Sequence, residues 1–393
     1  MRFFRDLTIS TFTAGLVAVL VAFASSVAVV YQAAQALGAT PEQVTSWVWA
    51  LSIGMGLCTV IPSLVLRKPV MIAWSTPGGA VVATAAVAGG FTMAEGIGAF
   101  VMGALLIILA GATGWFERAM SRIPMALASA LLAGVLGRFA LDAFSAARTA
   151  PALIGLMLLA YLVARRLAPR YAVVLTLLAG VAQAAFAGHM QWSAVTLEFA
   201  RPVFTMPVFS FSAFMSITLP LFIVTMASQN MPGVAVMRAT GYDQPISRLI
   251  TMTGVATLVF APFGGYAINL SAITAAICMG PGAHEDPGKR YTAAVVCGMF
   301  CLLIGVFAAV ITGLLMAFPK ELVLAIAGLA LLGSIGGGLA QALAKENERE
   351  AALITFLITL SGVAIAGIGS ALWGVVAGSI ALFVQQYRHK SSI

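Results

Sequence analysis

Small and polar residues interrupt two apolar runs at matching places in the two halves of the chain. In the first, Ser75-Thr76-Pro-Gly78-Gly79 follows the apolar stretch 71–74; in the second, Ser271-Ala-Ile-Thr274 follows 266–270, which contains Asn269. Ser and Thr are preferred at helix N-caps and Pro at the first helical position, so each interruption predicts an extended stretch that leads into a helix. Helix N-termini carry free N–H groups and about half a positive charge. Two such termini that meet would bind a small anion without any lysine or arginine.

The interrupted runs cannot cross a membrane as single helices, since ~30 Å of hydrocarbon requires about 20 helical residues. Extended backbone at that depth must be satisfied by protein, and residues 71–75 and 266–270 could do this by pairing as two short strands. Paired interruptions point to a substrate site near the middle of the membrane. Glycines 78 and 79 would let the ligand approach the backbone. The alternative is that both interruptions are Pro/Gly kinks between packed helices.

Two further polar clusters lie inside apolar helices. Ser228-Gln229-Asn230 offers donors and acceptors that could orient a carboxylate. Ser25-Ser26 occupies the corresponding place in the first half. Either cluster could instead hydrogen-bond to neighbouring helices.

One pair of charges, Arg138 and Asp142, lies four residues apart within an apolar segment and could form an ion pair. Charges inside a membrane are candidates for coupling or gating, but at the outer interface the same pair would be structural. The four cysteines lie in apolar runs without histidine or acidic partners in register, so we expect no metal site and no disulfide framework. Motifs of hydrolases, metalloproteases and ATPases are absent from the sequence, which argues against an enzyme; we expect no cofactor.

The composition requires a membrane protein. Of 393 residues 61% are hydrophobic and only 9% charged, and the mean hydropathy is +1.03. The net charge of +8 does not indicate nucleic-acid binding, because the basic residues are scattered at predicted helix ends. Residues 1–30 do not resemble a cleaved signal peptide.

The apolar pattern predicts an all-α polytopic protein with fourteen membrane segments, the third and tenth being a short strand followed by a half-helix. The segments are 12–37, 44–66, 71–88, 94–115, 125–147, 150–167, 171–188, 212–238, 246–265, 266–280, 291–318, 321–343, 351–369 and 370–387. With both termini inside, every basic residue except Arg138, Arg148, Arg201 and Lys320 falls at a cytoplasmic end. Seven segments precede the hydrophilic stretch 188–210 and seven follow it, so the halves form a 7+7 inverted repeat.

Several motifs resemble the benzoate/proton symporter family across essentially the full chain. They are Ala24-Ser-Ser, Trp74-Ser-Thr-Pro-Gly-Gly, Thr225-Met-Ala-Ser-Gln-Asn-Met-Pro-Gly, Ala261-Pro-Phe-Gly-Gly, Ala272-Ile-Thr-Ala-Ala-Ile-Cys and Ala327-Gly-Leu-Ala-Leu-Leu. The resemblance implies the seven-plus-seven fold of nucleobase carriers and sulfate-type anion carriers. It also implies a core domain (1–122 and 211–318) and a gate domain (123–210 and 319–393), and it allows a homodimer.

The resemblance further implies a secondary active transporter of the bacterial inner membrane that imports benzoate or a related aromatic carboxylate with a proton. The carboxylate would lie between the two half-helices, with its ring against Phe23, Tyr31, Trp74 or Phe263. Nucleobase carriers of this fold typically have a glutamate in the eighth helix, where this chain has Ser228-Gln229-Asn230, which favours an anion over a nucleobase. An anion channel of the same fold is the alternative. No buried acid identifies the residue that would couple transport to protons.

Overall fold

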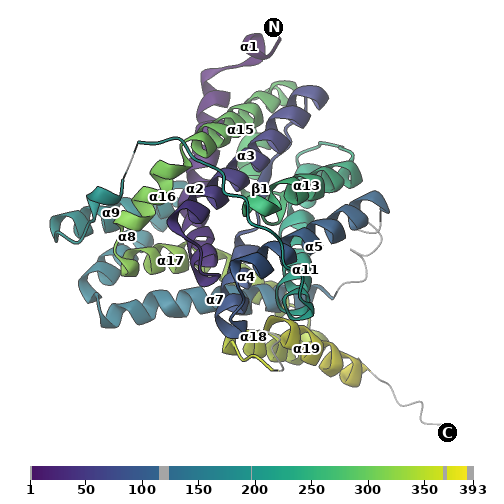
Figure 1. The fold of residues 1–393 in the computed structure, drawn as a ribbon. Coiled ribbons are helices and arrows are strands. Elements are labelled where there is room, and N and C mark those ends of the chain that lie inside the picture. Colours follow the sequence, from purple (N-terminus) through teal and green to yellow (C-terminus); the bar gives the residue numbers. More distant parts are fainter. Residues whose placement is uncertain (1, 115–123, 196, 366–369, 387–393) are drawn as a thin grey trace.

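The computed structural model describes residues 2–114, 124–195, 197–365 and 370–386, and nearly all of the secondary structure is helical (Figure 1). The helices of the first half are α1 (Arg2–Asp6), α2 (Ile9–Ala36), α3 (Pro41–Leu66), α4 (Thr76–Gly89), α5 (Met93–Ala112), α7 (Met125–Ser145), α8 (Pro151–Leu167) and α9 (Ala172–Phe186). Those of the second half are α10 (Phe211–Ala213), α11 (Leu219–Thr225), α12 (Met231–Ala239), α13 (Ile246–Phe260), α14 (Ile273–Met279), α15 (Tyr291–Val306), α16 (Ala308–Ala317), α17 (Lys320–Ala342), α18 (Arg349–Ser361) and α19 (Ser370–Gln386).

Every predicted membrane segment overlaps a described helix, and the chain is a multi-pass membrane protein. Within the described ranges, eight helical spans are long and apolar enough to cross a bilayer by themselves. Others, such as α4, α9 and α16, are apolar but shorter. The number of fourteen spanning segments therefore stays a prediction.

Threonines fix the starts of three long helices. Thr8, Thr40 and Thr92 cap α2, α3 and α5, and each forms a capping box with the residue three positions later. In a capping box the two side chains satisfy N–H groups that the helix leaves without partners.

The two predicted strands form as expected. β1 (Ile72–Trp74) pairs antiparallel with β2 (Ile268–Leu270), with Ala73 opposite Asn269. The ladder continues at both ends, where the N–H of Ser75 bonds to the carbonyl of Ala267 (3.0 Å) and that of Ser271 to the carbonyl of Met71 (2.9 Å). The two halves of the chain are thus joined by backbone hydrogen bonds where each half-helix begins.

Threonine hydroxyls of neighbouring helices accept hydrogen bonds from one backbone N–H group of each strand. The Oγ1 of Thr59 on α3 accepts from the N–H of Ile72 (3.3 Å), and the Oγ1 of Thr257 on α13 accepts from the N–H of Ile268 (3.0 Å). Each strand thereby gains a partner from the helix before it, as its buried backbone requires. The arrangement is the same in both halves, which supports the inverted repeat.

The eighth predicted segment is a helix with two widened π turns. They span Phe214–Thr218 and Met226–Asn230. Proline lacks an N–H and its ring clashes with the carbonyl four residues earlier, so Pro220 and Pro232 prevent α-helical bonds to Ser216 and Ser228. The helix continues past both prolines because the turns before them are widened. Such π turns are frequent at functional sites.

The predicted segment 291–318 is divided, because α15 ends at Val306 and α16 begins at Ala308. The carbonyl of Val306 accepts from the N–H of Ala200 in the connection between the halves (2.9 Å), and Val310 bonds instead to Phe307 (3.0 Å). The N–H of Ala200 thus occupies the Val306 carbonyl, which Val310 would bond in a continuous α-helix. Sequence periodicity does not indicate such a contact.

The helices pack in two groups. In one, α3 lies against α15, α5 against α13, and α2 against both α4 and α15. In the other, α7 lies against α17 and α18, α8 against α9, and α18 against α19, the last pair side by side at the lower edge of Figure 1. The groups meet where α2 contacts α17 and α4 contacts α7.

Candidate substrate site

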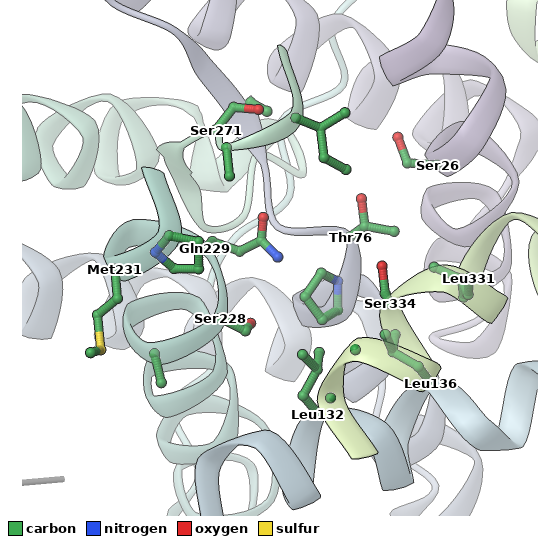
Figure 2. Close-up of a pocket in the computed structure, with 18 of the residues that line it drawn as sticks. Ser26, Thr76, Leu132, Leu136, Ser228, Gln229, Met231, Ser271, Leu331 and Ser334 are labelled. Carbon is green, nitrogen blue, oxygen red and sulfur yellow. The ribbon is translucent and has the colours of Figure 1, made fainter. Parts of the chain in front are cut away.

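A cavity of about 670 Å³ lies where the two helix groups meet. This volume is within the range typical of small-molecule sites. Both strand-to-helix junctions contribute to its wall, with α2, α3, the second π turn, α12, α7 and α17. Figure 2 shows polar tips from several elements converging in its centre.

Six of the twelve predicted substrate-binding residues line this cavity: Ser26, Thr76, Ser228, Gln229, Ser271 and Thr274. Five others, Ser75, Gly78, Gly79, Asn230 and Asn269, are buried outside its lining. The side chain of Ser25 lies outside the described part of the structure.

At the start of α4, Ser75 acts as the N-cap, and its Oγ accepts from the N–H of Gly78 (3.0 Å). The N–H of Ser75 donates to the carbonyl of Ala267, just before β2, and Pro77 has no N–H. Of the first four N–H groups that a helix leaves free, only that of Thr76 therefore remains for a ligand. The glycines allow close packing, because a Cβ on Gly78 would lie 2.5 Å from Leu221 and one on Gly79 would lie 2.4 Å from the Tyr266 hydroxyl. Gly78 and Gly79 therefore leave the space that the side chains of Leu221 and Tyr266, from the second half of the chain, occupy.

The start of α14 differs from that of α4. Ser271 and Thr274 share a hydroxyl–hydroxyl hydrogen bond (2.7 Å), and the helix has only seven residues. Its other end is held by buried Arg290, which donates to the carbonyl of Met279 (2.9 Å). A helix of two turns sums few peptide dipoles, so α4 supplies most of the positive potential at the cavity.

Asn230 and Asn269 hold the strand pair. The Oδ1 of Asn230 accepts from the N–H of Leu270 in β2 (3.0 Å), and the Nδ2 of Asn269 donates to the carbonyl of Ala267 (2.7 Å). In the first half, the Oγ of Ser26 accepts from the indole of Trp74 (3.0 Å) and donates to Ala22 (2.6 Å). Ser26 therefore orients Trp74 and keeps no proton for a ligand.

Five side chains of the described lining make no side-chain hydrogen bond to the protein: Thr76, Ser129, Gln229, Ser334 and Gln341. Figure 2 shows the tips of three of them, Thr76, Gln229 and Ser334, directed toward the same space. Ser228, by contrast, donates to the carbonyl of Val224 one turn earlier. Groups without protein partners beside a cavity are those that a ligand can use.

Sequence reasoning missed the wall formed by α7 and α17. Ser334, Gly337, Gly338 and Gln341 of α17 line the cavity, as do Ser129, Leu132 and Leu136 of α7. The spacing of 334, 337, 338 and 341 corresponds to one face of a helix. Small and polar residues along one face of an apolar helix were the signal that could have identified this wall.

Of the predicted aromatic walls, only Trp74 lines the cavity. Phe23 stands behind it in an edge-on contact, with ring centroids 4.8 Å apart. Phe263 instead contacts Trp49 and Phe204. Tyr31 accepts a hydrogen bond from Gln35 on α2.

Arg138 and Asp142 do not form the expected ion pair. The Arg138 guanidinium donates to the carbonyl of Ser361 (3.2 Å), at the end of α18, while Asp142 is exposed. The described ion pairs are Arg5–Asp6 and Lys345–Glu348. A cation at the C-terminal end of a helix interacts favourably with the last carbonyls, so Arg138 stabilises α18.

Known proteins similar to this chain are membrane proteins. It is 47% identical over 374 residues to the inner membrane protein YdcO of Escherichia coli (strain K12), covering 95% of each chain. It is 38% identical over 380 residues to the benzoate membrane transport protein of Acinetobacter baylyi, covering 97% of this chain and 96% of the relative.

Solved structures share the fold at low sequence identity. The transmembrane domain of a cyanobacterium bicarbonate transporter, BicA, matches 96% of this chain and 98% of its own with a TM-score of 0.60 and 14% identity. SLC26A9 matches 98% of this chain and 67% of its own with a TM-score of 0.61 and 13% identity. These similarities confirm the 7+7 transporter fold that the sequence predicted. The benzoate membrane transport protein family matches residues 5–384, and the chain belongs to that family.

Proposed function

We propose that this protein imports benzoate or a related aromatic carboxylate with a proton, by alternating access across the inner membrane. The observation that carries the proposal is the cavity in which Thr76, Gln229 and Ser334 offer hydrogen-bonding groups that no described residue uses. Family membership supports a small carboxylate as the ligand. The carboxylate lies near Thr76 at the start of α4, and the ring lies against Trp74 and the apolar side chains of α7.

We assign the two helix groups to the expected core and gate domains. In this proposal residues 1–122 and 211–318 are the core, which includes the strand pair, and residues 123–210 and 319–393 are the gate. Alternating access moves one domain against the other around the site. Because the strand pair belongs wholly to the core, a bound carboxylate would move with it.

The cavity wall indicates which side is open. It includes Met125 at the start of α7 and Gln341 near the end of α17, which lie on the predicted cytoplasmic side. Toward the other side, Gln32 of α2 reaches the carbonyl of Val323 on α17 (3.5 Å). With both termini cytoplasmic, this arrangement is inward-facing.

Counterflow in proteoliposomes tests the proposal. Vesicles preloaded with unlabelled benzoate should accumulate labelled benzoate transiently, with a saturable rate, and nucleobases in the lumen should not support this exchange. Vesicles without protein control for diffusion of the undissociated acid. Passive conductance of anions without counterflow would instead indicate a channel, and exchange driven by nucleobases alone would exclude the carboxylate.

A further inference from the structure

No titratable side chain lines the cavity in the described part of the chain. The lining consists of Ala, Gly, Pro, Leu, Ile, Met, Trp, Ser, Thr and Gln. None of these gains or loses a proton between about pH 4 and 10. A symporter must nevertheless hold the proton on some group while it moves the substrate.

The charged and titratable groups of the same elements lie outside the lining. On α2, Tyr31 bonds to Gln35, and on α7, Arg138 donates to the end of α18. The others are Glu42 and Cys58 on α3, Asp142 on α7, Arg238 on α12, Cys278 on α14, and Lys320 and Glu321 on α17. Glu117, Arg118 and Arg122, which precede α7, lie outside the described residues.

The unused polar groups match a protonated carboxyl group. A carboxylic acid has one donor and free acceptor positions, whereas a carboxylate only accepts. The primary amide of Gln229 can accept the carboxyl O–H at its Oε1 and donate its N–H to the carboxyl C=O. The hydroxyl of Thr76 can donate to the same carbonyl oxygen. This pairing uses both functions of the Gln229 amide, but a carboxylate would leave its oxygen without a donor.

Two opposing effects act on the pKa of a bound carboxyl group. Burial disfavours the charged form and raises a carboxyl pKa by as much as about 3–5 when burial is complete. The N-terminus of α4 favours the charged form, but a helix end typically lowers a pKa by less than about 1. With no cationic side chain in the described lining, burial outweighs the helix end. The pKa of the ligand, about 4 in water, therefore rises toward neutrality in the cavity.

We infer that the substrate itself carries the co-transported proton. The proton binds to a carboxylate oxygen as the substrate enters from outside and returns to water when the substrate leaves on the inside, so no protein residue is protonated. This inference rests on the proposed function, and it assigns the coupling group within it. Net charge does not cross the membrane with the substrate, so the membrane potential neither opposes nor drives import.

Proton uptake on binding tests the inference in purified wild-type protein. Binding of para-substituted benzoates is measured by calorimetry at several pH values, in buffers of different ionisation enthalpy, which reports protons taken up per ligand. Electron-withdrawing substituents lower the carboxyl pKa and electron-donating ones raise it. We expect uptake that is largest, approaching one proton per ligand, at pH values between the pKa of the free acid and the raised pKa of the bound acid, with pH midpoints that move in step with the pKa of each acid.

Two results would overturn the inference and leave the proposed function intact. One is binding without proton uptake. The other is uptake with one midpoint for all acids, which would place the proton on a protein group such as Glu117. Absence of binding by any aromatic carboxylate would instead refute the proposed function.

Discussion

Gln229 and Asn230 are adjacent in one widened helical turn but have opposite surroundings. The Gln229 side chain extends into the cavity without a protein partner, as Figure 2 shows. Asn230 is fully buried and bonds to the backbone of β2. Sequence alone placed both in the site, since residue type does not reveal which way a side chain points when the helix turn is widened by Pro232.

Alanine substitutions should separate these two roles. Gln229→Ala should weaken benzoate binding by about 1–3 kcal/mol and leave thermal stability near that of the parent. Asn230→Ala leaves the N–H of Leu270 buried without a partner, so it should lower stability by about 1–3 kcal/mol. Calorimetric titration and thermal unfolding in detergent measure the two effects, and Gln191→Ala, at an exposed position outside the cavity lining, is the matched control.

If Gln229→Ala binds benzoate as tightly as the parent, the amide does not contact the carboxyl group. A loss of stability in Gln229→Ala equal to that in Asn230→Ala would show that both side chains are structural.

At the scale of elements, the strand pair and half-helices were predictable because local chemistry encodes them. Ser75 and Pro77 indicate a helix start, and the apolar stretches before each break have the length of short strands. The unequal half-helices were not predictable, because α14 ends where Gly280 and Pro281 follow and where distant Arg290 binds its last carbonyl. The division of α15 from α16 likewise depends on a tertiary contact with Ala200.

The α17 helix should approach the core during transport. An added Cβ on Gly337, which lines the cavity, or on Gly333, which does not, would meet open space in this structure. Closure of the inner side brings the cavity face of α17 toward α12, so Gly337→Leu should slow counterflow. Overpacking of a closed interface typically costs about 1–3 kcal/mol.

Gly333→Leu controls for the change in helix propensity and hydrophobicity, and it should leave the counterflow rate unchanged. Equal rates for both variants would mean that the Gly337 face of α17 does not close against the core.

At the scale of the whole molecule, the sequence predicted the 7+7 fold and the family, whereas the number of fourteen spanning segments stays a prediction. The sequence indicated the residues of the interrupted segments that line the cavity but not those of α7 and α17. A cavity between two helix groups depends on how the groups pack against each other. Ser129, Ser334 and Gln341 come from α7 and α17, far in sequence from the interrupted segments. The periodicity of each helix shows an apolar face but does not show which helix it contacts.

Thiol protection at Ser334 tests most directly whether the substrate occupies the cavity between core and gate. Ser334→Cys places a thiol beside Thr76 and Gln229, whereas the native cysteines are buried. Its alkylation by a small water-soluble reagent should be slowed by benzoate at concentrations that saturate binding. Asn347→Cys, in the exposed loop after α17, should react at the same rate with or without benzoate. Unchanged labelling of Ser334→Cys, in protein that binds benzoate by calorimetry, would place the substrate site elsewhere.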